Sequence, residues 1–135
     1  MKKVNYLLIG IIFTLFLFSF DTTKAAAPTL ASQIAGNFKG MLRNPSGIFN
    51  DYEVVITEVN ATRVSIAPAS GSNSATFEVD LESQAIGSVT VITLKAPNDI
   101  FENNGTFVAS TGRLSYIYFL GSDDDRNIEV FIGDK

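Results

Sequence analysis

Alternation of apolar and polar side chains is the feature that most constrains the fold of this chain. It is clearest in residues 74–82, where every second residue is apolar: Ala75, Phe77, Val79 and Leu81. The residues between them are Thr, Glu and Asp. Successive side chains of a β-strand point to opposite faces, so this segment predicts a strand with one buried face and one solvated face.

Seven further segments have the β-branched and aromatic composition of strands and are bounded by residues typical of turns. The eight predicted strands span residues 36–43, 48–59, 62–69, 74–82, 87–96, 106–111, 113–120 and 126–133. One short helix is predicted at residues 28–35, where Pro28 suits the first turn and Gly36 ends the helix. Short connections favour antiparallel neighbours, because parallel pairing needs long crossovers.

The sequence therefore predicts an all-β domain, namely an eight-stranded antiparallel up-and-down β-barrel with a short N-terminal helix. Closure into a barrel removes the exposed strand edges that promote aggregation. A two-sheet β-sandwich built from the same strands is the alternative, because it also buries one face of each strand.

Residues 1–25 have the composition of a secretory signal peptide. Two lysines precede an apolar run at residues 7–18, and small residues follow at Ala25 and Ala27. The run is shorter than the roughly 20 residues that a transmembrane helix needs. We therefore expect signal cleavage, no membrane anchor afterwards, and a single secreted or periplasmic domain over residues 26–135.

The composition of residues 26–135 excludes several kinds of chemistry. This part carries seven Lys and Arg against 13 Asp and Glu, so nucleic acid would be repelled. The chain has no Cys and no His. Disulfides, thiol nucleophiles, His-assisted serine triads and the usual nitrogen or sulfur zinc ligands are thereby excluded. We expect no catalytic residue, no cofactor, no metal site and no nucleic-acid partner.

Two acidic clusters come nearest to a catalytic or metal site. Glu78, Asp80 and Glu82 share the polar face of one predicted strand, where nothing apolar would separate their pKa values as glycoside chemistry requires. Residues 123–125 are consecutive aspartates without the spacing of a calcium-binding loop. Both clusters are predicted to be solvated.

The tyrosines of residues 113–120 allow three interpretations. Tyr116 and Tyr118 share one face of the predicted strand with Leu114 and Leu120. Facing inward, their hydroxyls would orient the polar end of a ligand or simply complete the core. Facing outward, they would form an aromatic stripe suited to a partner protein.

The start of the domain resembles that of lipocalins. In that family a short helix leads into Gly-x-Trp on the first strand, and here residues 30–35 lead into Gly36-Asn37-Phe38, with Phe38 in place of Trp. The final hairpin, formed by residues 112–116 and 128–133, is similar to the ends of such calycin-like barrels. The resemblance implies a barrel that holds one small molecule.

We accordingly expect an exported, non-enzymatic, lipocalin-like binding protein for a small apolar or amphipathic molecule. The inward side chains expected to contact this molecule are Phe38, Val54, Ile56, Phe77, Val79 and Tyr116. These faces carry no charge, so the ligand is expected to be apolar. The alternative is an exported protein–protein interaction or inhibitor-like module whose core fills the barrel.

N-terminal sequencing of protein purified from its own host tests the signal peptide. The mature chain is expected to begin at Ala26 or Pro28, because signal peptidases recognise the small residues that precede these positions. Recovery of intact, Met1-led protein in the membrane fraction would show instead that the segment is an anchor.

Overall fold

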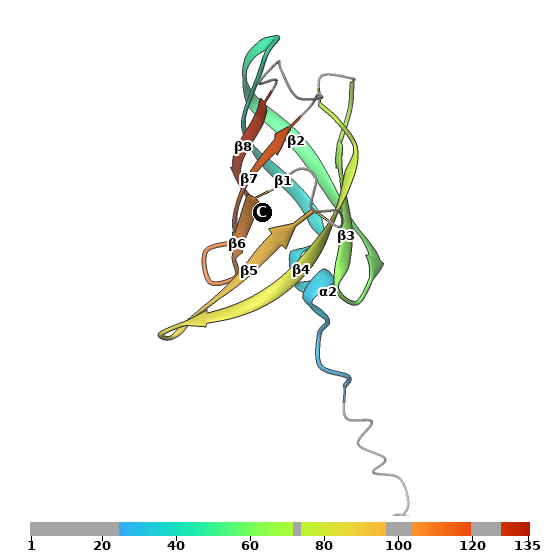
Figure 1. Ribbon diagram of the computed structural model, residues 1–135, viewed down its shortest axis with the longest axis vertical. Helices are drawn as coiled ribbons and strands as arrows, with labels where there is room; N and C mark the ends of the chain where they lie inside the picture. The colour runs from blue at the N-terminus through green and yellow to red at the C-terminus, as the bar shows by residue number, and fades with distance from the viewer. Residues whose placement is uncertain (1–24, 72–73, 97–103, 120–127) are drawn as a thin grey trace, which may run out of the picture.

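The structure, a computed structural model that describes residues 25–71, 74–96, 104–119 and 128–135, is a closed antiparallel barrel (Figure 1). Each strand pairs with the next in the chain, and the last strand returns to the first. The strands are β1 (Gly36–Asn44), β2 (Gly47–Asn60), β3 (Arg63–Pro68), β4 (Phe77–Ile86), β5 (Val89–Lys95), β6 (Asn104–Val108), β7 (Arg113–Phe119) and β8 (Ile128–Asp134). The predicted barrel is confirmed and the sandwich is excluded. The apolar run of the predicted signal peptide and residues 123–125 lie outside the described residues.

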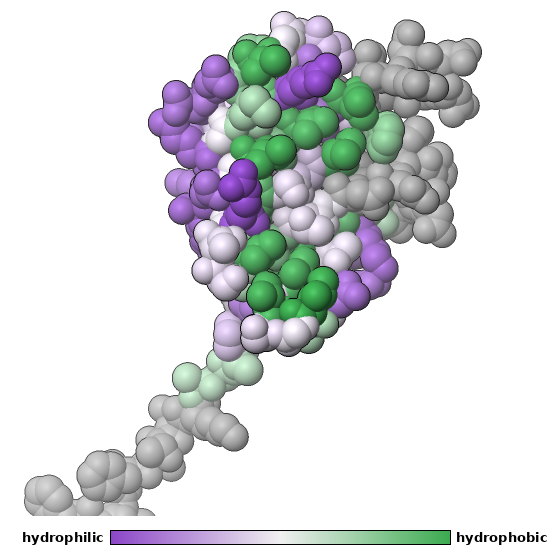
Figure 2. All heavy atoms as spheres, turned by 90° about the vertical axis from the view of Figure 1, so that its left-hand side faces the viewer, coloured by the Kyte–Doolittle hydropathy of each residue, from purple (hydrophilic) through white to green (hydrophobic). Residues whose placement is uncertain are grey.

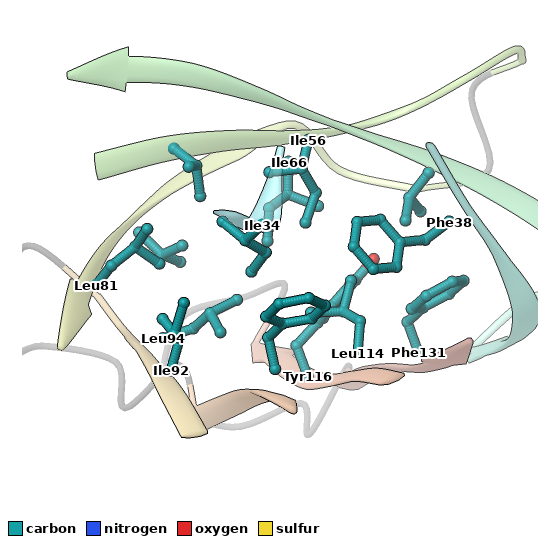
Figure 3. Close-up of a cluster of buried hydrophobic side chains, with 14 of the residues drawn as sticks. Ile34, Phe38, Ile56, Ile66, Leu81, Ile92, Leu94, Leu114, Tyr116 and Phe131 are labelled. Carbon is teal, nitrogen blue, oxygen red and sulfur yellow. The ribbon is translucent and has the colours of Figure 1, made fainter. Parts of the chain in front are cut away.

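Helix α2 (Leu30–Ile34) packs against one end of the barrel and is shorter than predicted (Figure 1). It begins after Thr29, whose Oγ1 accepts a hydrogen bond from the Ser32 amide at 3.0 Å and so caps the helix. Ala31 and Ile34 are fully buried, and Ile34 points toward the side chains of the strands (Figure 3). A helix this short depends on such docking.

Several strand boundaries differ from the prediction, and glycines account for two of the differences. β4 continues through residues 83–86, which were expected to be a connection, because a two-residue turn at Gly87 and Ser88 pairs Ile86 with Val89. Gly87 adopts a φ of 62°, which glycine tolerates.

The second difference concerns β6. It begins at Asn104, two residues before the predicted start of the strand at residue 106, and Gly105 pairs with Tyr116 of β7. A Cβ on Gly105 would lie 3.0 Å from the Tyr116 Cβ, so glycine serves here for close packing rather than for a turn.

The alternation predicted for β4 is confirmed. Phe77, Val79 and Leu81 are buried, whereas Glu78 and Glu82 are exposed. The same alternation around the barrel gathers the apolar side chains into one cluster inside it. This core comprises Ala31, Ile34, Phe38, Leu42, Val54, Ile56, Val64, Ile66, Phe77, Val79, Leu81, Ile92, Leu94, Phe107, Leu114, Tyr116 and Phe131.

β1 and β8 close the barrel through an unusually tight approach of their backbones. Gly40 of β1 pairs with Gly133 of β8. A Cβ on Gly40 would lie only 2.1 Å from the carbonyl oxygen of Ile132, and a Cβ on Gly133 would lie 2.7 Å from that of Lys39. No side chain can occupy either position unless the strands separate.

Gly40→Ala tests this closure. The added Cβ meets backbone that cannot rotate away, so we expect the free energy of unfolding to fall by about 3 kcal/mol or more. Urea melts measure the loss, and Met41→Ala on the adjacent outward position is the control, with an expected change below about 1 kcal/mol. Equal midpoints for the two variants would contradict the β1–β8 pairing.

Candidate functional site

All six predicted contact residues are buried inside the barrel. They are Phe38, Val54, Ile56, Phe77, Val79 and Tyr116, and Phe77 is the most exposed of them at 8%. The structure thus confirms that they face inward and share one core. Only Phe77 and Tyr116 meet as an aromatic pair, with ring centroids 5.4 Å apart, whereas Phe38 packs edge-on against Phe107.

Several aromatic rings stack on one another around Tyr116 inside the barrel. Phe77 stacks on Tyr118 with ring centroids 4.1 Å apart, and Tyr116 stacks on Phe131 at 5.4 Å. Figure 3 shows Tyr116 and Phe131 extending from neighbouring strands into the interior. Of the three interpretations of the tyrosines, the outward aromatic stripe is therefore wrong.

Glu129 is the functional candidate that the sequence analysis missed. It lies on β8 with no solvent exposure, and it is the only buried charged residue in the described part of the chain. The two faces of β8 differ in composition. Ile128, Val130 and Ile132 form the more apolar face, yet it is the opposite face, with Glu129 and Phe131, that points inward. The most apolar face of a strand normally faces the core, so the sequence pattern of β8 alone predicts that Glu129 points outward.

One carboxylate oxygen of Glu129 is well satisfied and the other is not. Oε1 accepts hydrogen bonds from the Ser74 hydroxyl at 2.5 Å and from the Tyr116 hydroxyl at 3.3 Å. Oε2 and the Tyr52 hydroxyl are buried without a hydrogen-bond partner among the described residues. Buried polar groups of this kind are rare in folded proteins and often mark functional positions.

Burial controls the protonation of this cluster. It raises the pKa of Glu129, against the opposing effect of the hydrogen bond from Ser74, the nearby Ala75 amide and the Tyr116 hydroxyl. It also raises the pKa of Tyr116, and the charge of Glu129 adds to the rise. Burial raises the pKa of Tyr52 as well. Ser74 opposes this rise, and the charge of Glu129 adds to it. Both phenols are therefore neutral over the physiological pH range.

The acidic residues of β4 lie on the outer surface, as predicted. Arg63 of β3 forms a bidentate pair with Asp80, with Nε to Oδ1 at 2.7 Å, and approaches Glu78 at 3.9 Å. The hydrogen bond from Arg63 lowers the pKa of Asp80. Lys95 of β5 pairs with Glu82 at 2.5 Å. These groups link neighbouring strands across the solvated face of the sheet.

The described residues contain no group of three or more potential metal ligands. They also contain no helix with the length and hydrophobicity needed to cross a membrane.

An apolar stripe covers part of the outer surface over β1, β8 and β7. Its exposed members are Met41, Ile117, Phe119 and Ile128, each about two-fifths exposed. The half-buried Val130 and Ile132 of β8 link them, because Ile132 pairs with Met41 and Val130 pairs with Ile117. Figure 2 views this side of the barrel and shows hydrophobic patches bordered by hydrophilic residues.

No family model, curated protein or solved structure matches this chain. The fold and the site define its class: a small closed antiparallel barrel with an aromatic interior and one buried carboxyl group.

The pH dependence of stability tests the burial of Glu129. The folded pKa is raised above its ordinary value of 4.5, so the folded state holds a proton that the unfolded state releases. The stability contributed by Glu129 is fully present below that value and is lost as the pH rises through the folded pKa. A difference of one between the folded and unfolded pKa values corresponds to about 1.4 kcal/mol of stability.

Glu129→Gln provides the matched comparison, because the amide mimics the protonated carboxyl group without titrating. Urea melts from pH 4 to 9 should show wild-type stability declining relative to the variant as the pH rises. Asp80, whose pKa is lowered in the folded state, also contributes to the pH dependence of stability, but its contribution is the same in both proteins and cancels in the comparison. A constant difference across this range would show that Glu129 titrates normally.

Proposed function

We propose that this protein is an exported binding protein that holds a small apolar or amphipathic molecule inside its barrel. The observation that carries the proposal is the combination of stacked aromatic rings with a buried carboxyl group whose Oε2 lacks a partner among the described residues. Binding sites for small molecules are typically apolar and contain a few placed polar groups that fix orientation. The lipocalin-like start of the domain and the composition of residues 1–25 support the same proposal.

The chemistry of the site supports ligand binding rather than catalysis. General acid–base catalysis depends on groups whose pKa lies near the working pH. Raised pKa values keep the Tyr52 and Tyr116 hydroxyls protonated, so neither is poised to accept a proton from a substrate. The side chains hydrogen-bonded to Glu129 in the described part of the chain, Ser74 and Tyr116, thus provide no proton-transfer partner, and we assign Glu129 to ligand recognition.

Fluorescence titration with a neutral hydrophobic probe such as Nile red tests the proposed function. Saturable binding with a single site is expected, and fatty acids, heme and retinoid-like molecules complete the panel. Val79→Trp should weaken probe binding at least tenfold, because the indole occupies interior volume that the apolar body of a ligand needs. The adjacent outward substitution Glu78→Trp is the control and should leave affinity unchanged.

Thermal melts of both variants establish that each is folded. Binding that survives Val79→Trp unchanged would place the site outside the barrel. Failure of the whole panel to bind would favour the alternative function, an interaction or inhibitor-like module with a filled core.

A further inference from the structure

The barrel interior holds an acidic group that no basic side chain of the described residues offsets. Every Lys and Arg among them is exposed or half-buried, and none forms an ion pair with Glu129. An ionised carboxylate removed from water is strongly disfavoured unless an opposite charge accompanies it. The interior is therefore complementary to a positive charge that this part of the chain does not supply.

Aromatic rings pack around the tyrosine that donates to this carboxyl group. The Tyr116 hydroxyl donates to Glu129, and the Tyr116 ring stacks on Phe131 and meets the edge of Phe77. Phe77 in turn stacks on Tyr118, which extends the aromatic surface. Ring faces attract cations, and the attraction strengthens where water is excluded. Carboxylate and rings together have the chemistry that recognises an organic cation.

Resting on the proposed function, we propose that the ligand is a protonated amine on an apolar body, with its N–H groups donating to Oε2 of Glu129. An ammonium group has three hydrogen-bond donors and no acceptor, which matches a buried oxygen that lacks a donor among the described residues. The Tyr52 hydroxyl, also without a partner in this part of the chain, offers a second acceptor for the same head group. The apolar body then lies among the core side chains.

Other head groups match the site less well. A carboxylate would be repelled by Glu129, and nothing among the described inward side chains would compensate its charge. An alcohol donates one hydrogen bond but brings no charge. A quaternary ammonium brings the charge but has no N–H to donate. The site thus predicts that a primary amine binds most tightly among ligands with the same chain.

Proton release accompanies amine binding. Burial keeps the carboxyl group of free Glu129 protonated above its ordinary pKa, and the ammonium stabilises the carboxylate, so the carboxyl proton passes to the buffer. The other titratable groups beside Glu129 are Tyr52 of β2, Tyr116 of β7 and Tyr118, which pairs with Glu129 in the β7–β8 register. Burial keeps Tyr52 and Tyr116 neutral. On β1, the strand paired with β8, Lys39 and Arg43 are exposed on the outer surface.

Four ligands with the same chain test the head group by competition against Nile red at pH 7: decylamine, decanol, decanoate and decyltrimethylammonium. Decylamine should displace the probe about tenfold more tightly than decanol, as expected for a charge-assisted hydrogen bond, and decanoate should bind most weakly. Decyltrimethylammonium should bind less tightly than decylamine because it cannot donate to Oε2.

Glu129→Gln preserves the shape of the side chain and removes its charge. The preference for decylamine over decanol should fall to about threefold or less, since only the rings then favour the cation. Glu78→Gln on the outer face of β4 is the matched control and should leave all four affinities unchanged. Calorimetry of the wild-type protein in buffers of different ionisation enthalpy should show proton release with decylamine and none with decanol, and this measurement does not depend on whether a variant folds.

The outcomes separate this inference from the proposed function. Decylamine binding no more tightly than decanol, or a preference that persists in folded Glu129→Gln, would overturn the amine assignment while leaving a binding protein. Decyltrimethylammonium binding as tightly as decylamine would overturn the hydrogen bond to Oε2. Absence of binding by Nile red and by all four ligands would overturn the proposed function itself.

Discussion

Closure of the sheet between its first and last strands is the constraint on which the rest of this structure depends. The backbones of β1 and β8 meet where Gly40 pairs with Gly133, and the contact leaves no room for a Cβ on either residue. Because side chains alternate along a strand, the register fixed by this contact decides which face of β8 points inward. The inward positions of Glu129 and Phe131 follow from that register rather than from the hydrophobicity of β8.

Two kinds of packing meet in the closed interior. Most of the core is aliphatic, and Ile34 of α2 contributes to it (Figure 3). Around Tyr116, stacked rings share the interior with the carboxyl group of Glu129. Aliphatic packing stabilises the barrel through burial alone. The groups around Tyr116 include polar atoms held out of water, so stability alone does not explain their presence.

The sequence predicted most of the fold and only the apolar part of the candidate site. Strict alternation in β4 identified Phe77 and Val79 as inward, and short connections identified the antiparallel order. The β4–β5 turn and the start of β6 were predicted at the wrong residues, because a glycine alone does not reveal its role. Gly87 forms a turn, whereas Gly105 allows a close contact between strands. Glu129 was missed because only the pairing of β8 with β1 and β7 reveals its direction.

Burial of Glu129 is unfavourable for the free barrel, since a well-packed apolar residue would avoid the desolvation of a carboxyl group. Protonation lowers this cost but leaves Oε2 without a partner among the described residues. A bound ammonium group removes both problems at once, because it supplies the missing donors and the missing charge. The same arrangement gives the proposed site its selectivity: a neutral ligand leaves the carboxyl group protonated, whereas a cation alone makes its ionised form stable beside the aromatic rings.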